Sequence, residues 1–588
     1  MRRLRAGGGS RTEELKGPEP AVAPCLIRPI VSRQFGSLRQ PSQGSLMAVK
    51  SYLRGPPVGA YDAIVVGSGI GGLSAAALLA RYGGRRVLVL ERHYTAGGFT
   101  HTFRRPKYEW DVGVHYIGDV RPGSMLRALF DAIGDGSLKW ADMGEVYDRA
   151  VLGDECFDFR AGREKLRHDL KIRFPAEVDA IDRYLELLDV VGSSTTHFFM
   201  EKALPAPVAA VAGRFLRHRY LRHARLTTRE VLESLTSDQR LIGLLTTQWG
   251  DYGLPPGLSS FGMHALVAAH YCEGAFYPVG GAARIAESIL PVIAEAGGQA
   301  MVRAEVSEIV VEGGRAVGVR MAADGSFLRA PLIISDAGAR NTFVTLLSAA
   351  VAGPLGVLDR LEGLGSSTAH LCLYVGLSQT AQELDLPRAN LWIYPDEDHD
   401  RTFRAMTETD PGRRMVYVSF PSAKDPDFQQ RHPGRATIDI ITLASARAFS
   451  DWDGTRWKKR GEEYDALKDR LAHRLLDALY EHVPQARGKV DTWELSTPLT
   501  TRHFANQPHG EIYGLAHTPR RFEQRWLRPR TILPGLYLTG QDVATAGVAG
   551  ALIGGTLCAS AILRKNLMGI IAREMGATPV LGRVRAGG

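Results

Sequence analysis

The stretch from residue 61 to residue 91 is the feature that most constrains how this chain folds. It reads YDAIVVGSGIGGLSAAALLARYGGRRVLVLE, and Gly67, Gly69 and Gly72 give it the spacing G-x-G-x-x-G. An apolar run precedes the glycines, a run rich in Ala and Leu follows them, and a second apolar run ends at Glu91. Strand, glycine turn, helix and second strand in this order predict a Rossmann-type dinucleotide-binding unit.

Each glycine of this motif has a separate physical role. Gly67 permits the tight turn, Gly69 lets the backbone approach a pyrophosphate, and Gly72 lets the helix pack closely on the strand. The helix N-terminus offers free N–H groups and a positive dipole end to the phosphates. The carboxylate of Glu91 is suited to accept hydrogen bonds from ribose hydroxyls, whereas a 2′-phosphate would favour a basic residue there.

The residues that follow Glu91 favour FAD over NAD as the dinucleotide. The sequence RHYTAGGFTHTF places Gly97 and Gly98 shortly after the acid. This resembles the extended motif of two-dinucleotide-binding flavoproteins, in which a second glycine pair approaches the FAD. The sequence contains no second complete strand–GxGxxG–helix pattern, so we expect one tightly held FAD.

The stretch GLYLTGQDVATAGVAGALIGGTLCASAIL, residues 535–563, is predicted to complete the same site. GLYLTG reads as a strand that ends at Gly540, and a helix is expected from about Gly547. In flavoproteins of this kind, the carboxylate of Asp542 would meet the ribitol or a hydroxyl on the pyrophosphate side. The helix N-terminus, at Val548, would point at the flavin pyrimidine and stabilise negative charge there.

The same stretch raises a second possibility, because residues 543–563 carry no charge and are long enough to cross a bilayer. Their many glycines favour a buried helix instead, since a spanning helix would be richer in Leu and Ile. Five scattered cysteines without a CxxC pair indicate free thiols in a reducing compartment. We therefore expect a cytoplasmic protein with peripheral membrane contact. The histidines show no metal-ligand spacing, so no metal site is predicted.

Between the two ends, MVRAEVSEIVVEGGRAVGVRM (301–321) alternates and predicts strand, turn and strand, with the backbone of Val306 beside the adenine. The fold class is α/β: a Rossmann-type two-dinucleotide-binding FAD domain with an inserted α+β substrate domain. HLCLYVGL and RMVYVSF read as sheet strands of the insertion, and EEYDALKDRLAHRLLDALYEHV as an amphipathic helix. The predicted parts are a disordered basic extension (1–60), a discontinuous FAD-binding domain (61–120, 270–345 and 490–565), a substrate and membrane-facing domain (121–269 and 346–489) and a tail (566–588).

The net charge of +9 is concentrated at the start of the chain. Residues 1–50 hold nine Lys and Arg against three Glu, so the other 538 residues carry only +3. The basic balance therefore does not indicate a nucleic-acid partner. The extension lacks the apolar core of a secretory signal. An organelle transit peptide is an alternative, against which Glu13 and Glu14 count, and Met47 is a possible start.

Several further stretches resemble the phytoene desaturase-like flavoproteins, and within them most closely the retinol saturases and carotenoid isomerases. The resemblance extends from about residue 61 to residue 563 and implies FAD as the sole prosthetic group. It also implies a lipophilic polyene, a retinoid or carotenoid, as substrate, with redox or cis–trans chemistry at its C=C bonds. The matching stretches are GGFTHTF, WDVGVHYIGD, WGDYGLPP, HYCEGAFYPVGG, STPLTTRHF, GEIYGLAHT and LYLTGQDVATAGVAGAL.

Saturation of a C=C bond requires a hydride at one carbon and a proton at the other. The family pattern implies that His115, Tyr116 and Tyr277 lie near the isoalloxazine, and they are the catalytic candidates. Further candidates for the proton donor are His503, Tyr513 and His517. No separate NAD(P)H domain is visible, so the electrons would come from a donor protein or from transiently bound NAD(P)H.

Other functions fit the same motifs. Isomerase and desaturase reactions use the same scaffold within the family. An amine-oxidase-like flavoenzyme would share the nucleotide motifs. A non-catalytic flavin-binding protein at a membrane surface would also share them. The reductase of a retinol-like polyene is the leading hypothesis.

One basic segment, GRFLRHRYLRHARL (213–226), indicates how an apolar substrate could be reached. Its five arginines are interleaved with Phe, Leu and Tyr, and the segment contains no acidic residue. Such a segment is suited to lie on anionic lipid. A solvated basic helix is the alternative.

Overall fold

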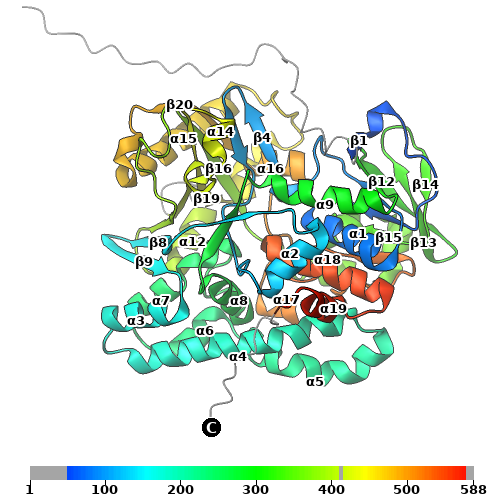
Figure 1. Ribbon diagram of the computed structural model, residues 1–588, viewed down its shortest axis with the longest axis horizontal. Helices are drawn as coiled ribbons and strands as arrows, with labels where there is room; N and C mark the ends of the chain where they lie inside the picture. Colours follow the sequence, from blue (N-terminus) through cyan, green and yellow to red (C-terminus); the bar gives the residue numbers. More distant parts are fainter. Residues whose placement is uncertain (1–48, 409–414, 578–588) are drawn as a thin grey trace, which may run out of the picture. The chain divides into compact units, whose positions relative to one another are not determined.

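We analysed a computed structural model of the chain, which describes residues 49–408 and 415–577 (Figure 1). The predicted extension up to residue 48, with Cys25 and Met47, lies outside the described residues. The prediction of a disordered extension as far as residue 60 is wrong at its end. Strand β1 (Val49–Ser51) pairs in parallel with β11, and Tyr52 of the following 3₁₀ turn (Tyr52–Arg54) is buried. Pairing at a sheet edge orders this segment, and its short sequence carries no signal of that pairing.

A six-stranded sheet, parallel throughout, forms the nucleotide-binding half. Its two central strands are the predicted ones on either side of α1 (Ile70–Gly83). The core strands are buried along their whole length, as expected for a parallel sheet covered on both faces. From edge to edge the order is β1, β11 (Gln299–Val302), β3 (Val87–Leu90), β2 (Ala63–Val66), β15 (Ile333–Ser335) and β21 (Leu536–Leu538).

Helix α18 (Gly547–Leu563) starts where the sequence predicted and packs beside α1 (Figure 1). Its glycines allow this close approach. A Cβ on Gly555 would lie 2.6 Å from the backbone oxygen of Gly71, and one on Gly554 would lie 2.3 Å from the backbone oxygen of Gly540. Ten residues of α18, from Gly550 to Ala561, are buried. The glycines therefore serve backbone packing against α1 and the strand that closes the sheet.

No single helix of the described residues is long and apolar enough to cross a membrane. Helices α18 and α19 (Leu567–Glu574) reach the required length and composition only as a pair, and the chain bends by 110° between them. Helix α19 lies in the predicted tail and buries Leu567 and Ile571.

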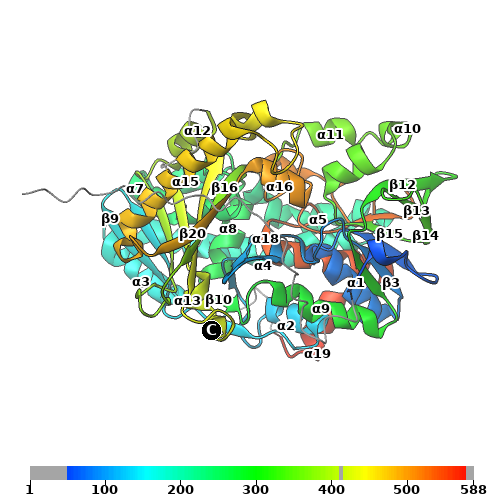
Figure 2. The same cartoon turned by 90° about the horizontal axis from the view of Figure 1, so that it is seen from above.

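A second sheet has seven strands, and its two faces differ in chemistry because side chains alternate along each strand. Leu371, Leu373 and Ile440 lie on the outer face, which α15 (Glu462–His482) covers (Figure 2). The inner face carries polar and aromatic side chains. The strand order is β20 (Val490–Ser496), β16 (Ala369–Leu377), β19 (Ala436–Ala444), β18 (Val416–Ser419), β17 (Asn390–Tyr394), β8 (Val146–Leu152) and β9 (Glu155–Arg160).

Strand β20 differs from the sequence prediction, which placed residues from 490 onward in the nucleotide-binding domain. It pairs antiparallel with β16 of the second sheet. The stretch 301–321 also differs, because β11 ends at Val302 and joins the parallel sheet, while Val306 starts a separate strand. The smaller sheets are β12 (Val306–Glu312), β13 (Arg315–Met321) and β14 (Phe327–Arg329); β6 (Ile117–Gly118), β10 (Ala275–Pro278) and β7 (Trp140–Asp142); and β4 (Thr102–Arg105) with β5 (Tyr108–Asp111).

Helices α4 and α5 are tied to the C-terminal segment by cationic side chains that donate to backbone carbonyls. Lys202 of α4 donates to the oxygen of Val543 at 2.6 Å, and Arg217 of α5 donates to that of Phe522 at 2.8 Å. Arg521 donates to the oxygen of Gln541 at 2.6 Å. The inserted helices include α2 (Met125–Gly134), α3 (Arg163–Arg173), α4 (Val178–Ala203), α5 (Ala206–Ala224), α6 (Thr228–Glu233), α7 (Gln239–Leu245) and α8 (Phe261–Tyr271).

The other helices are short, with the exception of α9 and α12. Helix α9 packs on α1. They are α9 (Ala283–Glu295), α10 (Ala349–Ala352), α11 (Leu358–Glu362), α12 (His399–Glu408), α13 (Pro421–Lys424), α14 (Phe428–Arg431), α16 (Pro498–Ala505) and α17 (Pro519–Glu523).

The packing of α18 predicts a stability effect. The substitution Gly554→Ala should lower the free energy of unfolding by about 1–3 kcal/mol, because its methyl group meets backbone that cannot move aside. Gly363→Ala is the matched control, since the residue ends α11 with helical backbone angles and a Cβ there meets only the guanidinium end of the exposed Arg520. Chemical denaturation of both variants measures the difference, and equal stabilities would contradict the packing described.

Candidate functional site

Glycines from three distant segments meet at the carboxyl ends of the central strands. Gly67 has a φ of +101°, which favours glycine. A Cβ on Gly98 would lie 2.9 Å from the Cα of Gly69, and one on Gly71 would lie 2.4 Å from the Cα of Gly540. We call Gly67, Gly69, Gly72, Gly98 and Gly540 the glycine cradle. The structure thus brings together the first motif, the second glycine pair and the closing strand.

Glu91 lies at the end of β3, beside the cradle, and is buried. Its carboxylate accepts hydrogen bonds from the N–H and hydroxyl of Ser68, at 2.9 and 2.7 Å, and from the N–H of His93 at 2.7 Å. Its backbone oxygen accepts from the N–H of Ala304 at 2.7 Å, two residues before Val306. These bonds fix the carboxylate at the position where a ribose is expected.

Asp542 and Val548 occupy the closing side of the cradle. The carboxylate of Asp542 accepts from the N–H of Ala339 at 2.7 Å and from that of Leu515 at 3.0 Å. Asp542 thus joins the end of the first sheet to the segment before α17, a structural role that the sequence prediction did not include. Val548 lies in the first turn of α18, where backbone N–H groups have no partner within the helix.

The sequence analysis missed Asp336, which directly follows β15 and lies against the cradle. Its carboxyl lies against Gly69 and Gly72 at the N-terminus of α1, and the backbone of these two glycines partly opposes the rise of its pKa. Burial, together with the carboxylates of Glu91 and Asp542, raises its pKa to about 8. Near neutral pH the group is therefore mostly a neutral acid in the place where phosphates would bind.

The inner face of the seven-stranded sheet carries a row of polar side chains across neighbouring strands. Tyr374 pairs with Asp439, Asp439 with Ser419, and Asn390 with Asp148. We call these five residues the polar row. Lys424 lies over its centre. The Nζ atom of Lys424 donates to the Oγ of Ser419 at 2.8 Å, to the Oδ1 of Asn390 and to the backbone oxygen of His115 at 2.9 Å.

Burial lowers the pKa of Lys424 to about 7, although Asp148, Asp439 and Asp111 oppose the shift. All three protons of its ammonium group are engaged in these hydrogen bonds. Lys424 therefore joins the loop that carries His115 to the inner face of the sheet. Sequence reasoning did not select it, because the signal is only a lysine after a short buried strand.

His115, one of the predicted catalytic residues, lies at this junction. Its Nδ1 is 3.7 Å from the Oδ2 of Asp439, and its ring lies 5.4 Å from that of Tyr417. Burial and the neighbouring Lys424 lower the pKa of the imidazole to about 3. Resting His115 is therefore neutral, and its Nδ1 has no hydrogen-bond partner among the described residues.

Tyr116, the next residue, is held between two buried acids. Its hydroxyl oxygen lies 3.0 Å from the Oδ2 of Asp148 and 2.9 Å from the Oδ2 of Asp251. Its ring stacks on that of Tyr271 with centroids 4.2 Å apart. His115 and Tyr116 therefore lie together, next to the polar row.

The other candidates lie in different surroundings. Tyr277 is buried and donates to the carboxylate of Asp111, so its proton is engaged. Tyr513 is half-buried. Burial raises the pKa of its hydroxyl, and the nearby Asp251 raises it further. His517 is fully buried without a partner for either ring nitrogen in the described chain. His503 is exposed and stacks on Trp457.

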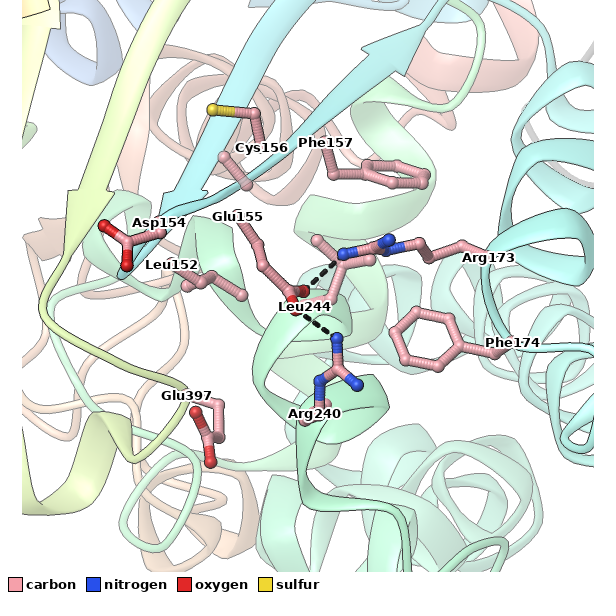
Figure 3. A pocket seen from close by; sticks show the side chains of 11 residues that line it. Leu152, Asp154, Glu155, Cys156, Phe157, Arg173, Phe174, Arg240, Leu244 and Glu397 are labelled. Atoms are coloured by element: carbon pink, nitrogen blue, oxygen red, sulfur yellow. Dashed lines mark hydrogen bonds and ion pairs between the residues drawn. The ribbon is translucent and has the colours of Figure 1, made fainter.

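A separate pocket of about 300 Å³ lies at the β8–β9 edge of the seven-stranded sheet (Figure 3). Phe157, Phe174 and Leu244 supply apolar walls. Arg173 and Arg240 both pair with Glu155, as the dashed lines of Figure 3 show. Because the lining also contains Asp154 and Glu397, its acids outnumber its two cations, and the pocket is unsuited to an anionic ligand.

Comparison with known proteins places this geometry in a family. A family model for NAD(P)-binding Rossmann-like domains matches residues 65–133. The all-trans-retinol 13,14-reductase of Danio rerio is 36% identical over 527 residues, which are 86% of each chain. The chain belongs to the all-trans-retinol 13,14-reductase family. The predicted resemblance and the oxidoreductase class are thereby confirmed.

The other similar proteins are named for different activities, and one is named as inactive. An inactive all-trans-retinol 13,14-reductase of Danio rerio is 32% identical over 526 residues, 86% of each chain. A chloroplastic prolycopene isomerase from an Oncidium hybrid cultivar is 25% identical, covering 85% of this chain and 83% of its own. The solved structure of putrescine oxidase bound to putrescine has a TM-score of 0.57 at 15% identity, covering 87% of this chain and all of the other. That likeness shows the fold alone, and it confirms the predicted α/β class.

The position of Asp336 predicts a pH-dependent retention of the dinucleotide. As pH rises through about 8, its carboxyl ionises beside the phosphates, so the wild-type protein should lose dinucleotide. Asp336→Asn should retain it across that range, because the amide stays neutral. Dinucleotide content after desalting at a series of pH values measures this effect.

The exposed acid Asp135, changed to Asn, is the control for this experiment and should behave as wild type. If wild type and Asp336→Asn lost dinucleotide over the same pH range, the assignment of the effect to Asp336 would be wrong.

Proposed function

We propose that the protein is an FAD-dependent oxidoreductase that saturates a C=C bond of a retinol-like polyene. Because the family contains a member named as inactive, the proposal rests on this chain's own residues as well as on its relatives. Electrons would come from a donor protein or from transiently bound NAD(P)H.

The residues present fit FAD. The glycine cradle leaves no room for side chains where backbone must meet a pyrophosphate, since a Cβ on Gly69 would lie 2.5 Å from the Asp336 carboxyl. Glu91 stands where the adenosine ribose is expected, and the first turn of α18 has N–H groups for the flavin pyrimidine. When bound, reduced flavin supplies a hydride.

The observation that carries the polyene proposal is the aromatic wall beside His115 and Tyr116. The rings of Tyr116, Tyr271, Tyr417 and Trp392 form a connected set with neighbouring centroids 4.2 to 6.4 Å apart. Flat rings of this kind suit a conjugated apolar chain. The hydroxyl of Tyr417 is buried and has no partner in the described chain, so it can meet a polar end group.

Isomerisation of a carotene is the second candidate, favoured by the likeness to prolycopene isomerase. Isomerisation leaves the number of hydrogens unchanged, and desaturation removes two. The mass of the product therefore separates the three reactions.

The substrate test uses the purified FAD-loaded protein without oxygen. Reduced enzyme given all-trans-retinol should yield a product with two more hydrogens, detected by chromatography with mass detection. A poly-cis carotene is tested as a second substrate, and the oxidised enzyme is tested in parallel with both polyenes. An unchanged mass at a new retention time would replace saturation by isomerisation, loss of two hydrogens from oxidised enzyme would indicate desaturation, and no change in either polyene would refute the substrate class.

We further propose that α5 lies on an anionic membrane surface, from which an apolar substrate enters. Val208, Val211 and Phe215 share one face of α5 and are 49%, 75% and 70% exposed. Arg214, Arg219 and Arg222 on the same helix are also exposed. Of the other two arginines of the predicted segment, Arg217 is buried against the carbonyl of Phe522 and Arg225 pairs with Glu523.

Vesicle binding tests this surface. The double variant Val211→Ser and Phe215→Ser should bind vesicles of phosphatidylcholine and phosphatidylserine about 10-fold or more weakly, because two apolar side chains no longer enter the interface. Co-sedimentation measures binding, with Phe327→Ser, an exposed aromatic on β14, as the control. Equal binding by wild type and the double variant would remove α5 from the proposal.

A further inference from the structure

The hydroxyl of Tyr116 has one proton but two carboxyl oxygens within hydrogen-bond distance, at 2.9 and 3.0 Å. It can donate to only one of them, so the other would face a lone pair of the phenol oxygen. In a buried setting this contact is favourable only if that second carboxyl carries a proton and donates it to Tyr116. The geometry therefore requires one protonated acid.

The two acids differ in their other partners. Asp148 also accepts from the side-chain amides of Asn390 at 2.8 Å and Gln248 at 2.7 Å, and it is fully buried. Those donors stabilise an ionised carboxylate. In the described part of the chain, Tyr116 is the one side chain that bonds the carboxyl of Asp251.

We propose that Asp251 holds a proton at rest and is the proton donor for saturation of the double bond, with Tyr116 and Asp148 as positioning residues. This inference rests on the proposed function and names the residue that completes it. Burial and the neighbouring Asp148 also raise the pKa of Asp251 well above its ordinary value.

A second observation indicates that a ligand reaches this place. Asp251 is partly exposed, while Trp249, Gly250 and Tyr252 around it are buried. The hydroxyl of Tyr417 has no partner in the described chain although the residue is only 3% exposed, and Asp251 contributes to raising its pKa. Both groups thus lie near the Tyr116 ring, which is 6.4 Å from that of Tyr417.

The atoms and electrons of the step balance. Bound reduced flavin would supply the hydride for one carbon of the double bond. The O–H bond of Asp251 would break as its proton forms a C–H bond at the other carbon. Asp251 is left as a carboxylate and takes up a proton from solvent before the next turnover. Before the transfer, Tyr116 directs its proton toward Asp148 and its oxygen toward the O–H of Asp251.

Several charged or titratable groups surround this pair and bear on its pH dependence. Asp148 faces it from β8, and Tyr271 from α8. Lys424 reaches the network through Asn390. The ring of His115 lies 5.4 Å from that of Tyr417 and beside Asp439, and Tyr513 lies near Asp251.

The test compares Asp251→Asn with the matched variant Asp148→Asn. Infrared spectroscopy of the FAD-loaded protein without substrate should show a protonated-carboxyl C=O band that Asp251→Asn removes and Asp148→Asn leaves in place. Single-turnover saturation by reduced Asp251→Asn should be about 100-fold slower or more, the usual range for a lost general acid. In wild type the rate should fall as pH rises through the raised pKa of Asp251, and Asp251→Asn should lack that decline.

Tyr116→Phe provides a variant that keeps both acids, and it should shift the C=O band by removing the bond to Asp251. Loss of the band in Asp148→Asn but not in Asp251→Asn would overturn the placement of the proton. Saturation by Asp251→Asn at the wild-type rate would overturn the donor role. Failure of wild type to convert any polyene would refute the proposed function instead, and the infrared result would still decide which acid is protonated.

Discussion

The contact between the backbone of the first glycine motif and the backbone around Gly540 is the constraint on which the rest of the structure depends. It joins segments that are more than 450 residues apart in sequence. Because the contact is between main chains, it admits no side chain on Gly71 or Gly554, and the carboxyl of Asp336 excludes one on Gly540. It sets the position of Asp542 and of the N-terminus of α18, and these two features close the dinucleotide site.

The sequence was most informative where one continuous segment carries the whole signal. The strand, glycine turn and helix at residues 61–91, the strand ending at Gly540 and the start of α18 were all predicted and were found. These elements depend on local turn chemistry and on apolar periodicity. His115 and Tyr116 were selected through resemblance, and the structure places them together, while Tyr277 proved to be bonded to Asp111.

Other parts of the site could not be predicted, because their residues meet only in three dimensions. Lys424 donates to the backbone of His115 across 309 positions, and Asp148 meets Asn390 across 242. Only a weak signal was present: Asp148 in VYDRAVL and Asp439 in ATIDIITLA are acids within largely apolar strands. An acid in such a strand is unfavourable unless partners satisfy it, so it indicates a functional or paired position. Strand β1 was missed because a three-residue strand carries no usable periodicity.

The bonds that tie α4 and α5 to the C-terminal segment have a mechanical consequence. Lys202 holds Val543, Arg217 holds Phe522, and Arg521 holds Gln541, the residue before Asp542. A load applied to the exposed face of α5 is therefore passed through rigid backbone to the carboxylate that closes the cradle. The outer helices are thus part of the same hydrogen-bonded framework as the loop that carries Asp542, so a displacement of α5 would also displace that loop.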